Sequence, residues 1–241
     1  MVKVKVALAF AAVLFAGCVG AEQPVEATIK KTIEARLGTA AKVDSVTATP
    51  YAGLYEVRIG NEIMYTDKTA EYLFVGDVYN AKTSQNITRM RKDELNKIKF
   101  SELPLGLALK TVKGDGKRVI AIFEDPNCGY CKRFRQTTLK QVENVTVYTF
   151  MYNILSPDSF VKSANVWCSV DRNKTWDDWM VEGKVPPNVT KKCDTPNDKV
   201  VELGQKLRIE GTPAIFFADG SRIPGAVDLQ TLEAKFAAIK K

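Results

Sequence analysis

The sequence contains no histidine among its 241 residues. This absence excludes every catalytic pair or triad in which an imidazole is the base, and it excludes zinc sites that need histidine ligands. It also excludes attachment of a c-type haem, because Lys132 follows the second cysteine of the Cys-x-x-Cys motif where that attachment site has histidine. Other side chains must therefore carry any enzymatic chemistry of this chain.

A long apolar run is missing as well, and the run at the N-terminus covers only Val6–Gly17. A run of this length is too short to span a membrane as a helix. Because a basic start precedes it and small residues follow, residues 1–21 are typical of a secretory signal peptide cleaved before Glu22. The stretch Phe15-Ala16-Gly17-Cys18 also resembles a lipoprotein cleavage box, which would leave a lipid anchor on Cys18. Both interpretations predict export into a compartment that permits disulfides.

No basic patch stands out along the chain. The formal net charge is +7, and lysine and arginine alternate with aspartate and glutamate nearly everywhere. Proteins that bind nucleic acid through its phosphates concentrate their basic residues on one face or in runs. We therefore predict no nucleic-acid partner. The 45% of hydrophobic and 26% of charged residues are typical of a globular protein with one large or two small domains.

Cysteine is scarce, with five residues, but its positions carry most of the functional information. Cys18 belongs to the N-terminal segment, and the even number that remains suits two disulfides in an exported protein. Cys168 and Cys193 stand apart from each other and from the motif. We predict that they form a structural disulfide, which stabilises the segment between them by about 3 kcal/mol because it restricts the unfolded chain.

The motif Cys128-Gly129-Tyr130-Cys131 lies where a strand ends and a helix begins. The apolar run Val119–Phe123 precedes it, and residues 132–136 are typical of a helix. The first turn of a helix has unpaired N–H groups and a partial positive charge, which lower the pKa of a thiol placed there. We therefore expect Cys128 to be the exposed, nucleophilic cysteine. Cys131, one turn deeper, is expected to attack a mixed disulfide formed at Cys128.

A zinc site and a structural disulfide are the alternatives for this cysteine pair. Structural zinc needs four ligands, and the sequence has neither a second Cys-x-x-Cys nor any histidine. A structural disulfide is rarely placed across two residues at a helix start. We therefore predict a redox-active pair with no metal and no other cofactor.

Two acidic residues, Glu124 and Asp125, stand just before the motif. A carboxylate beneath the buried cysteine could accept the proton of Cys131 when that thiol attacks. Solvated charges at the end of a strand are the alternative. The sequence pattern does not decide between the two.

The pattern of apolar residues divides the chain into two units and a linker. Residues 22–84 predict a small helix-and-sheet unit, with a helix over 24–37 and strands over 42–49, 54–59, 62–66 and 72–75. Such a unit buries little core alone, so it pairs with a second copy or packs on its own chain. The charge-rich residues 85–105 predict an exposed linker helix. Residues 106–241 predict an α/β domain, with strands over 118–123, 145–151 and 211–217 and helices over 128–141, 159–170, 174–182, 197–207 and 229–240.

A Cys-x-x-Cys motif at a strand-to-helix junction, with Gly211-Thr212-Pro213 before a later strand, resembles the thioredoxin fold. This resemblance implies a cis peptide bond before Pro213 and places Thr212 and Pro213 opposite the cysteines. It also implies that these two residues contact an extended substrate together with Gly129 and Tyr130 of the motif.

The Cys-Gly-Tyr-Cys motif, the stretch Gly53–Val57, the linker and the Trp167-Cys168 pair together resemble the DsbC/DsbG family of periplasmic disulfide isomerases. The resemblance implies a thioredoxin-like catalytic domain with a helical insertion, after a small cystatin-like α+β dimerisation domain in residues 22–84. It also implies a homodimer whose two catalytic domains face a shared cleft. The chain departs from the family at Lys132, where many members have histidine, and we expect the lysine cation still to favour the Cys128 thiolate.

The same resemblance implies the reaction and its partners. The Cys128 thiolate would attack wrong disulfides in misfolded exported proteins of the periplasm, and a substrate thiol would complete the exchange. Cys131 would resolve stalled intermediates, and a membrane thiol reductase would keep the pair reduced. The alternatives are a thiol-disulfide or sulfenic acid reductase, or a holdase chaperone, of the DsbG type. All share the motif and differ in redox potential and substrate surface.

Overall fold

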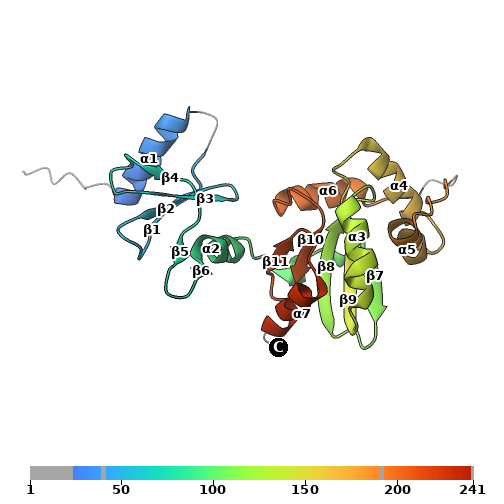
Figure 1. Cartoon of the computed structure of the whole chain (residues 1–241). Coiled ribbons are helices and arrows are strands. Elements are labelled where there is room, and N and C mark those ends of the chain that lie inside the picture. Colours follow the sequence, from blue (N-terminus) through green and yellow to red (C-terminus); the bar gives the residue numbers. More distant parts are fainter. Residues whose placement is uncertain (1–23, 39–41, 190–192, 240–241) are drawn as a thin grey trace, which may run out of the picture. The chain divides into compact units, whose positions relative to one another are not determined.

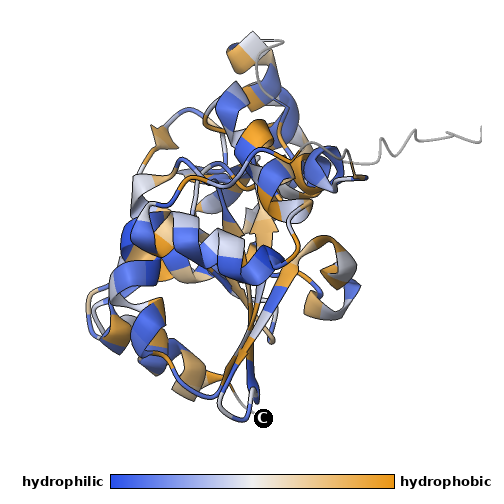
Figure 2. Ribbon diagram, turned by 90° about the vertical axis from the view of Figure 1, so that its right-hand side faces the viewer, coloured by the Kyte–Doolittle hydropathy of each residue, from blue (hydrophilic) through white to orange (hydrophobic). Residues whose placement is uncertain are grey.

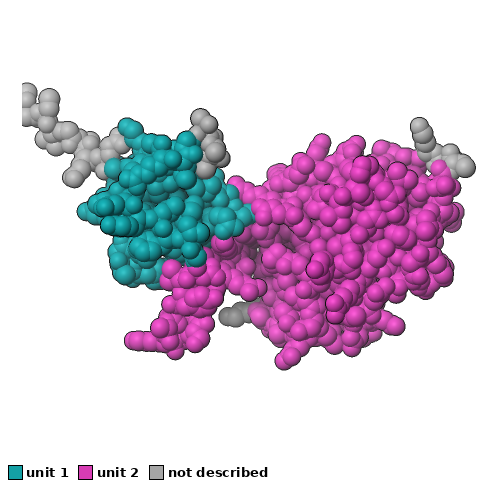
Figure 3. All heavy atoms as spheres, turned by 45° about the horizontal axis from the view of Figure 1, so that its top comes forward, with its two compact units in different colours: residues 1–76 teal, residues 77–241 magenta. Residues whose placement is uncertain are grey.

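The computed structural model describes residues 24–38, 42–189 and 193–239. The predicted signal peptide and Cys18 lie outside these described residues. The chain divides into two compact units, residues 1–76 and 77–241 (Figure 3). No helix within the described ranges is long and apolar enough to cross a membrane.

The first unit consists of one helix and a four-stranded antiparallel sheet (Figure 1). Helix α1 (Val25–Leu37) buries Ile29 and Ile33, which lie on one face because they are four residues apart. The strands lie side by side in the order β1-β2-β3-β4, with bounds Ser45–Ala48, Tyr55–Ile59, Glu62–Thr66 and Leu73–Phe74. Each predicted element of this unit is present, with its ends shifted by at most a few residues.

The linker differs from its prediction as a single helix over 85–105. A short hairpin of β5 (Tyr79–Asn80) and β6 (Gln85–Asn86) leads into helix α2 (Ile87–Leu95). The Asn86 side chain caps this helix by accepting the N–H of Arg89 at 2.8 Å. The hairpin is tied to α2, since the Ile87 N–H donates to the Val78 carbonyl, and so the compact units divide at residue 76 instead of the predicted 84.

The predicted linker helix is wrong beyond residue 95, because the chain there leaves the helical path to bury apolar side chains. Two short 3-10 turns follow, η2 (Phe100–Glu102) and η3 (Leu105–Leu107). Leu103 is buried in the core of the second unit, with Ile98 packed against the same cluster. The N–H of Ile98 also donates to the Gly220 carbonyl at 3.0 Å. This half of the linker therefore belongs to the second unit.

The second unit is built on a five-stranded sheet with the strand order β11-β10-β8-β9-β7 (Figure 1). The bounds are β7 Leu109–Lys113, β8 Arg118–Glu124, β9 Val145–Met151, β10 Ala214–Phe217 and β11 Arg222–Pro224. Strands β8 and β9 are parallel, and the other three pairs are antiparallel. Strand β7 was not predicted, because two lysines and a threonine among its five residues leave no continuous apolar run.

Helices cover both faces of this sheet. Their bounds are α3 Gly129–Thr137, α4 Pro157–Trp167, α5 Arg172–Glu182, α6 Asn197–Lys206 and α7 Leu229–Ala238, with a 3-10 turn η4 over Leu139–Gln141. The predicted helix over 128–141 is therefore an α-helix continued by a 3-10 turn. Helices α4 and α5, between β9 and α6, form the predicted helical insertion.

The core of the second unit covers both faces of strand β8. Ile120 and Ile122 pack into one apolar cluster with Phe134 of α3. Phe123, on the alternate face, belongs to a second cluster with Val200 of α6. Figure 2 shows hydrophobic residues concentrated along the strands and hydrophilic stretches on the helices around them. A strand buried on both faces holds its C-terminal end rigidly, and the cysteine motif follows that end.

Candidate active site

The cysteine motif caps the N-terminus of helix α3. Strand β8 ends at Glu124, and α3 begins at Gly129 with Cys128 as its N-cap residue. The Cys128 sulfur accepts the backbone N–H of Cys131 at 3.1 Å, as a serine or aspartate oxygen does in other helices. The predicted strand-to-helix junction is present, and an N–H of the first turn points at the sulfur.

The two thiols differ strongly in acidity. The pKa of Cys128 is lowered to about 6, and a hydrogen bond with the Cys131 side chain is the largest cause. Burial of the sulfur opposes this lowering. Hydrogen bonds with the Thr212 side chain and the Cys131 backbone N–H lower the pKa of Cys128 further. Burial raises the pKa of the Cys131 thiol, and the hydrogen bond with Cys128 and the negative charge of Glu124 raise it further. Cys128 is therefore the thiolate near neutral pH, and Cys131 remains protonated.

Cys128 is less exposed than predicted. Its exposed fraction is 3%, against 0% for Cys131, so the expectation of a surface thiol is wrong. The reason is the loop that ends in the cis peptide bond between Thr212 and Pro213. The Thr212 carbonyl accepts the Cys128 S–H at 3.3 Å and covers the sulfur.

Of the residues predicted to contact substrate, Thr212 lies against the Cys128 sulfur, and Gly129 and Tyr130 follow Cys128 directly in the chain. Tyr130 is 73% exposed and Gly129 is exposed beside it, whereas Pro213 is buried beneath the loop. A hollow of about 450 Å³ is lined by Tyr130 together with Arg133 and Val227. A second hollow, of about 370 Å³, borders Thr212 and Pro213. Cys128 itself lines neither hollow, and substrate contact by these residues stays a prediction.

The low pKa of Cys128 predicts the pH dependence of its reactivity. Because the thiolate reacts and the thiol does not, the rate of Cys128 alkylation should be nearly constant at neutral pH and fall as the pH falls through about 6. Rapid alkylation of the reduced protein across the pH range, with mass spectrometry to identify the modified cysteine, measures the midpoint. A midpoint near the ordinary value of a free thiol would contradict the arrangement described here.

The Lys132 ammonium group lies over the ring of Trp179. Its Nζ lies 3.5 Å from the ring centroid of Trp179, and Nζ of Lys162 lies 4.8 Å from the same centroid. Burial and the neighbouring Lys162 lower the pKa of Lys132. The expected support of the Cys128 thiolate by Lys132 stays a prediction. An unchanged alkylation midpoint in Lys132→Gln would contradict it.

Asp125 holds the loop before Cys128 to the insertion. Its carboxylate is 0% exposed and accepts hydrogen bonds from the N–H groups of Asn127 and Ile154 at 2.8 Å and of Leu155 at 3.0 Å. The Ser159 hydroxyl of α4 also donates to it, at 2.8 Å. The interpretation of Asp125 as a solvated charge is therefore wrong. This positioning role was missed because its partners lie about thirty residues away in the sequence.

Glu124 is also fully buried, which excludes the solvated alternative for it as well. Its Oε2 accepts a hydrogen bond from Nε of Arg135 at 2.8 Å and forms an ion pair with Nη2 of the same guanidinium at 2.7 Å. Nη1 of Arg135 donates to Asp177 of α5 at 2.9 Å, and Nη2 donates to the Thr149 hydroxyl at 2.7 Å. Burial raises the pKa of Glu124, and the guanidinium opposes that rise.

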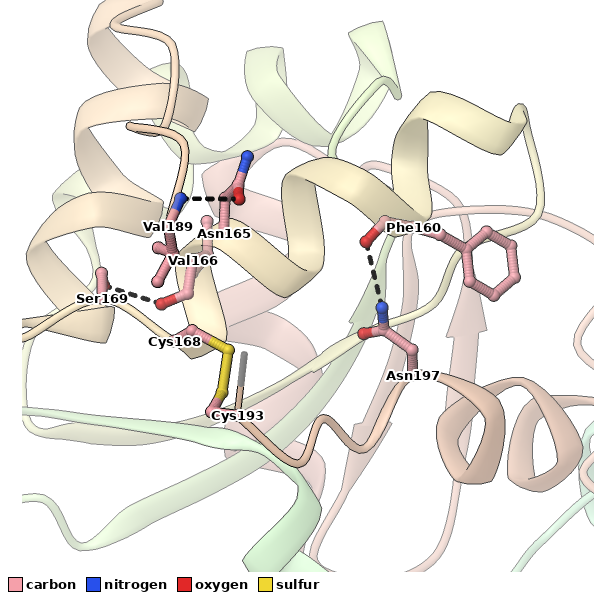
Figure 4. The surroundings of a disulfide bond; sticks show 8 residues. All are labelled: Phe160, Asn165, Val166, Cys168, Ser169, Val189, Cys193 and Asn197. Carbon is pink, nitrogen blue, oxygen red and sulfur yellow. Dashed lines mark hydrogen bonds between the residues drawn. A yellow bond between two sulfur atoms is a disulfide. The ribbon is translucent and has the colours of Figure 1, made fainter. Parts of the chain in front are cut away.

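Cys168 and Cys193 form a disulfide in the structure, with their Cα atoms 5.7 Å apart (Figure 4). Cys168 ends α4, and Cys193 lies in the segment that leads to α6. The Asn197 amide at the start of α6 donates to the Phe160 carbonyl of α4 at 3.0 Å. The bridge thus joins the insertion to the helix that follows it, at a distance from the redox pair in sequence.

Acidic and cysteine side chains of the described residues do not gather into a metal site. Within residues 24–38, 42–189 and 193–239 the structure has no group of three or more such side chains that could hold an ion.

Comparisons with known proteins agree with this fold. Residues 105–240 match the thioredoxin-like domain family, and residues 20–89 match the N-terminal domain of disulfide bond isomerase proteins. The two matches confirm the predicted fold, a thioredoxin-like domain that follows a small α+β domain. The first of them covers more than half of the chain.

Relatives over most of the chain are thiol:disulfide interchange proteins. The chain is 50% identical over 193 residues to the probable thiol:disulfide interchange protein DsbC of Bordetella pertussis, covering 80% of this chain and 68% of the relative. It is 27% identical over 215 residues to DsbC of Escherichia coli, covering 88% and 87%. A crystal structure of a disulfide interchange protein from Neisseria gonorrhoeae matches with a TM-score of 0.53 and 37% identity, over 56% of this chain and 96% of that one. The chain therefore belongs to the DsbC family of thiol:disulfide interchange proteins.

Proposed function

We propose that this protein is a disulfide isomerase that reshuffles incorrect disulfides in exported proteins, with Cys128 as its nucleophile. The observation that carries the proposal is the unequal acidity of the pair. Cys128 attacks readily because its pKa is about 6. Cys131 is slow to displace the substrate, because its thiol is fully buried and its pKa is raised. A mixed disulfide that persists is what isomerisation needs.

The exchange conserves electrons. The Cys128 thiolate attacks one sulfur of a wrong disulfide, forms a mixed disulfide and releases the other substrate sulfur as a thiolate. A substrate thiolate then attacks the substrate sulfur that is bonded to Cys128, so a new substrate disulfide forms and Cys128 leaves as a thiolate. When Cys131 attacks Cys128 instead, the substrate is reduced and the enzyme is oxidised. A thiol reductase at the membrane would then have to return two electrons to the pair.

The exposed apolar residues of the first unit support a homodimer through residues 22–84. Strand β4 is at the edge of its sheet, with β3 as its one neighbour in the strand order. Leu73 and Phe74 of this strand are 43% and 50% exposed, and Tyr72 and Val75 beside them are 61% and 78% exposed. An exposed apolar edge strand is a surface for pairing with another strand, and a second copy of this chain is the partner we propose.

Breaking this edge tests the proposal. We expect Phe74→Asp to weaken the dimer by about thirtyfold or more, since truncating a central interface residue costs at least about 2 kcal/mol. Reactivation of a scrambled multi-disulfide protein in a glutathione buffer should then fall toward the uncatalysed rate. Reduction of a small disulfide should not change, because the cysteine pair is intact. Sedimentation velocity measures the dimer in the same samples.

A matched control places the same charge on the second unit. Val185 is 71% exposed on the insertion, so Val185→Asp should leave both the dimer and isomerisation unchanged. A monomeric Phe74→Asp that still isomerises at the wild-type rate would contradict the dimeric isomerase and favour a thiol-disulfide or sulfenic acid reductase. Suppression of aggregation that survives Cys128→Ser together with Cys131→Ser would favour a holdase chaperone.

Export to the periplasm is part of this proposal. Residues 1–21 would direct it, with cleavage before Glu22 or lipid attachment at Cys18. Mass spectrometry of the mature protein from the exporting cell distinguishes the two, because only one of them retains Cys18. No further cofactor enters the proposed reaction.

A further inference from the structure

Glu124 is a fully buried carboxyl group to which the exchange steps assign no role. It is the last residue of β8, and its exposed fraction is 0%. Two guanidinium nitrogens of Arg135 contact a single oxygen of Glu124, Oε2: Nε donates a hydrogen bond at 2.8 Å, and Nη2 lies at 2.7 Å. This arrangement is that of an ion pair, so Glu124 carries a negative charge inside the protein.

Arg135 shares its single positive charge between two carboxylates. Its Nη1 donates to Asp177 at 2.9 Å, and the Asp177 side chain is 50% exposed on α5. Glu124, Arg135 and Asp177, here called the charge triad, therefore carry a net negative charge. The titratable groups around Glu124 are Cys131 and Arg135 of α3, Asp177 of α5, and Cys128 at the start of α3.

Arg135 contacts only one oxygen of Glu124, and the other oxygen, Oε1, is buried as well. Among the described residues, neither Oε1 of Glu124 nor the buried indole N–H of Trp176 has a partner at ordinary hydrogen-bond distance, and a weaker interaction between the two side chains lowers the pKa of Glu124. Charge in a site without water is screened far less than charge at the surface. Cys131 lies in this buried region, in the same cluster as Trp176. The Glu124 charge acts on the Cys131 thiol there and raises its pKa, in addition to burial and the hydrogen bond with Cys128.

We propose that Glu124, kept charged by Arg135, slows the attack of Cys131 on the mixed disulfide and so lets a substrate thiol attack first. In the slowed step, Cys131 loses its proton to solvent and its thiolate attacks the Cys128 sulfur. The bond from Cys128 to the substrate breaks, and the substrate sulfur leaves with the electron pair. Glu124 acts on this step by disfavouring the Cys131 thiolate on which the step depends.

This inference rests on the proposed function, because slow attack by Cys131 is useful to the protein only if it is an isomerase. The slowed step itself occurs in any Cys-x-x-Cys exchange. The proposed effect of Glu124 on the rate of Cys131 attack is opposite to that of a base that removes the Cys131 proton. A base would speed the step, and its removal would slow it. The two roles therefore give opposite changes in one measured rate.

The test follows the release of a peptide thiol in a single turnover of the full-length reduced protein. Excess cystine-linked peptide forms the mixed disulfide in a concentration-dependent phase, and Cys131 resolves it in a phase that does not depend on concentration. We expect Glu124→Gln to speed this second phase, because more of Cys131 is then present as thiolate. A tenfold rise in the thiolate fraction should give a rate increase of only about threefold, because a less basic thiolate is also a weaker nucleophile. The pH profile of the second phase should move to lower pH.

Asp177→Asn supplies a second variant at the half-exposed end of the triad, where loss of folding is not a concern. Without the Asp177 charge, the positive charge of Arg135 is less neutralised, which favours the Cys131 thiolate. Asp177→Asn should therefore also speed resolution, by a smaller factor than Glu124→Gln. Glu182→Gln is the matched control, because Glu182 lies on the same helix, is 51% exposed and pairs with Lys184 outside the triad. It should leave the resolution rate and its pH profile unchanged.

Faster resolution by Glu124→Gln and Asp177→Asn, with a lower yield of isomerised substrate, supports the proposal. Slower or unchanged resolution in a folded Glu124→Gln overturns it, and slower resolution assigns Glu124 as a base. If Glu124→Gln does not fold, the direction of the Asp177→Asn change decides. A wild-type protein that resolves quickly and never isomerises would overturn the proposed function, while the rate differences between variants would still test the role of Glu124.

Discussion

Replacing Cys128 by serine should abolish thiol–disulfide exchange, with a loss of at least about a thousandfold in rate. The hydroxyl of serine does not ionise near neutral pH, whereas the Cys128 thiol is held at a pKa of about 6 by its hydrogen bonds. The backbone arrangement should survive, because a serine oxygen can accept the Cys131 N–H as an ordinary helix cap. Reduction of a small disulfide and reactivation of a scrambled protein both measure the loss.

Cys131→Ser is the matched variant, since it removes the other thiol of the same motif. It should still form the mixed disulfide at Cys128, but it should release the substrate only when another thiol attacks. The trapped complex with a cysteine-containing peptide is then visible by mass spectrometry. Comparable residual activity in Cys128→Ser and Cys131→Ser would contradict the assignment of Cys128 as the nucleophile.

Removing the second disulfide should destabilise the protein without touching the redox pair. The bridge joins Cys168 to Cys193 across 25 residues of the chain, so replacing both by serine should lower the free energy of unfolding by about 3 kcal/mol. Most of this loss comes from greater freedom of the unfolded chain. Urea unfolding of the oxidised protein, followed by tryptophan fluorescence, measures the change.

Reductant provides the control for this prediction. Strong reduction should destabilise the wild type by a similar amount and leave the double serine variant nearly unchanged, because that variant has no bridge to lose. The pKa of Cys128 should be the same in both, since the bridge lies outside its hydrogen bonds. Equal stability of the oxidised wild type and the double serine variant would contradict a stabilising role for the bridge.

Prediction from the sequence succeeded where a signal is local. The junction before Cys128 was evident, because an apolar strand, a Cys-x-x-Cys motif and a helical pattern follow one another directly. Helix α1 was placed to within one residue by its apolar spacing and by Gly38 at its end. Strand β9, a run of β-branched and aromatic residues that ends in methionine, was predicted with its observed bounds.

Prediction failed where remote residues determine the environment. Cys128 was expected at the surface, and the loop that ends at Thr212 covers it. The linker was expected to be one exposed helix, and its second half, including Leu103, is part of the core instead. Strand β7 exists because β9 offers it an edge to pair with, which no pattern within residues 109–113 reveals.

The sequence alone determined the chemistry that this protein can use. The lack of histidine, the spacing of two cysteines and their place at a helix start are covalent and local facts, and they lead to a thiol nucleophile. The tertiary structure alone decided how that chemistry is tuned. Whether Glu124 is solvated or buried depends on Arg135 and Asp177, which are brought to it by packing. Local backbone geometry is encoded by neighbours in the chain, whereas burial and electrostatic fields depend on every group that folding places nearby.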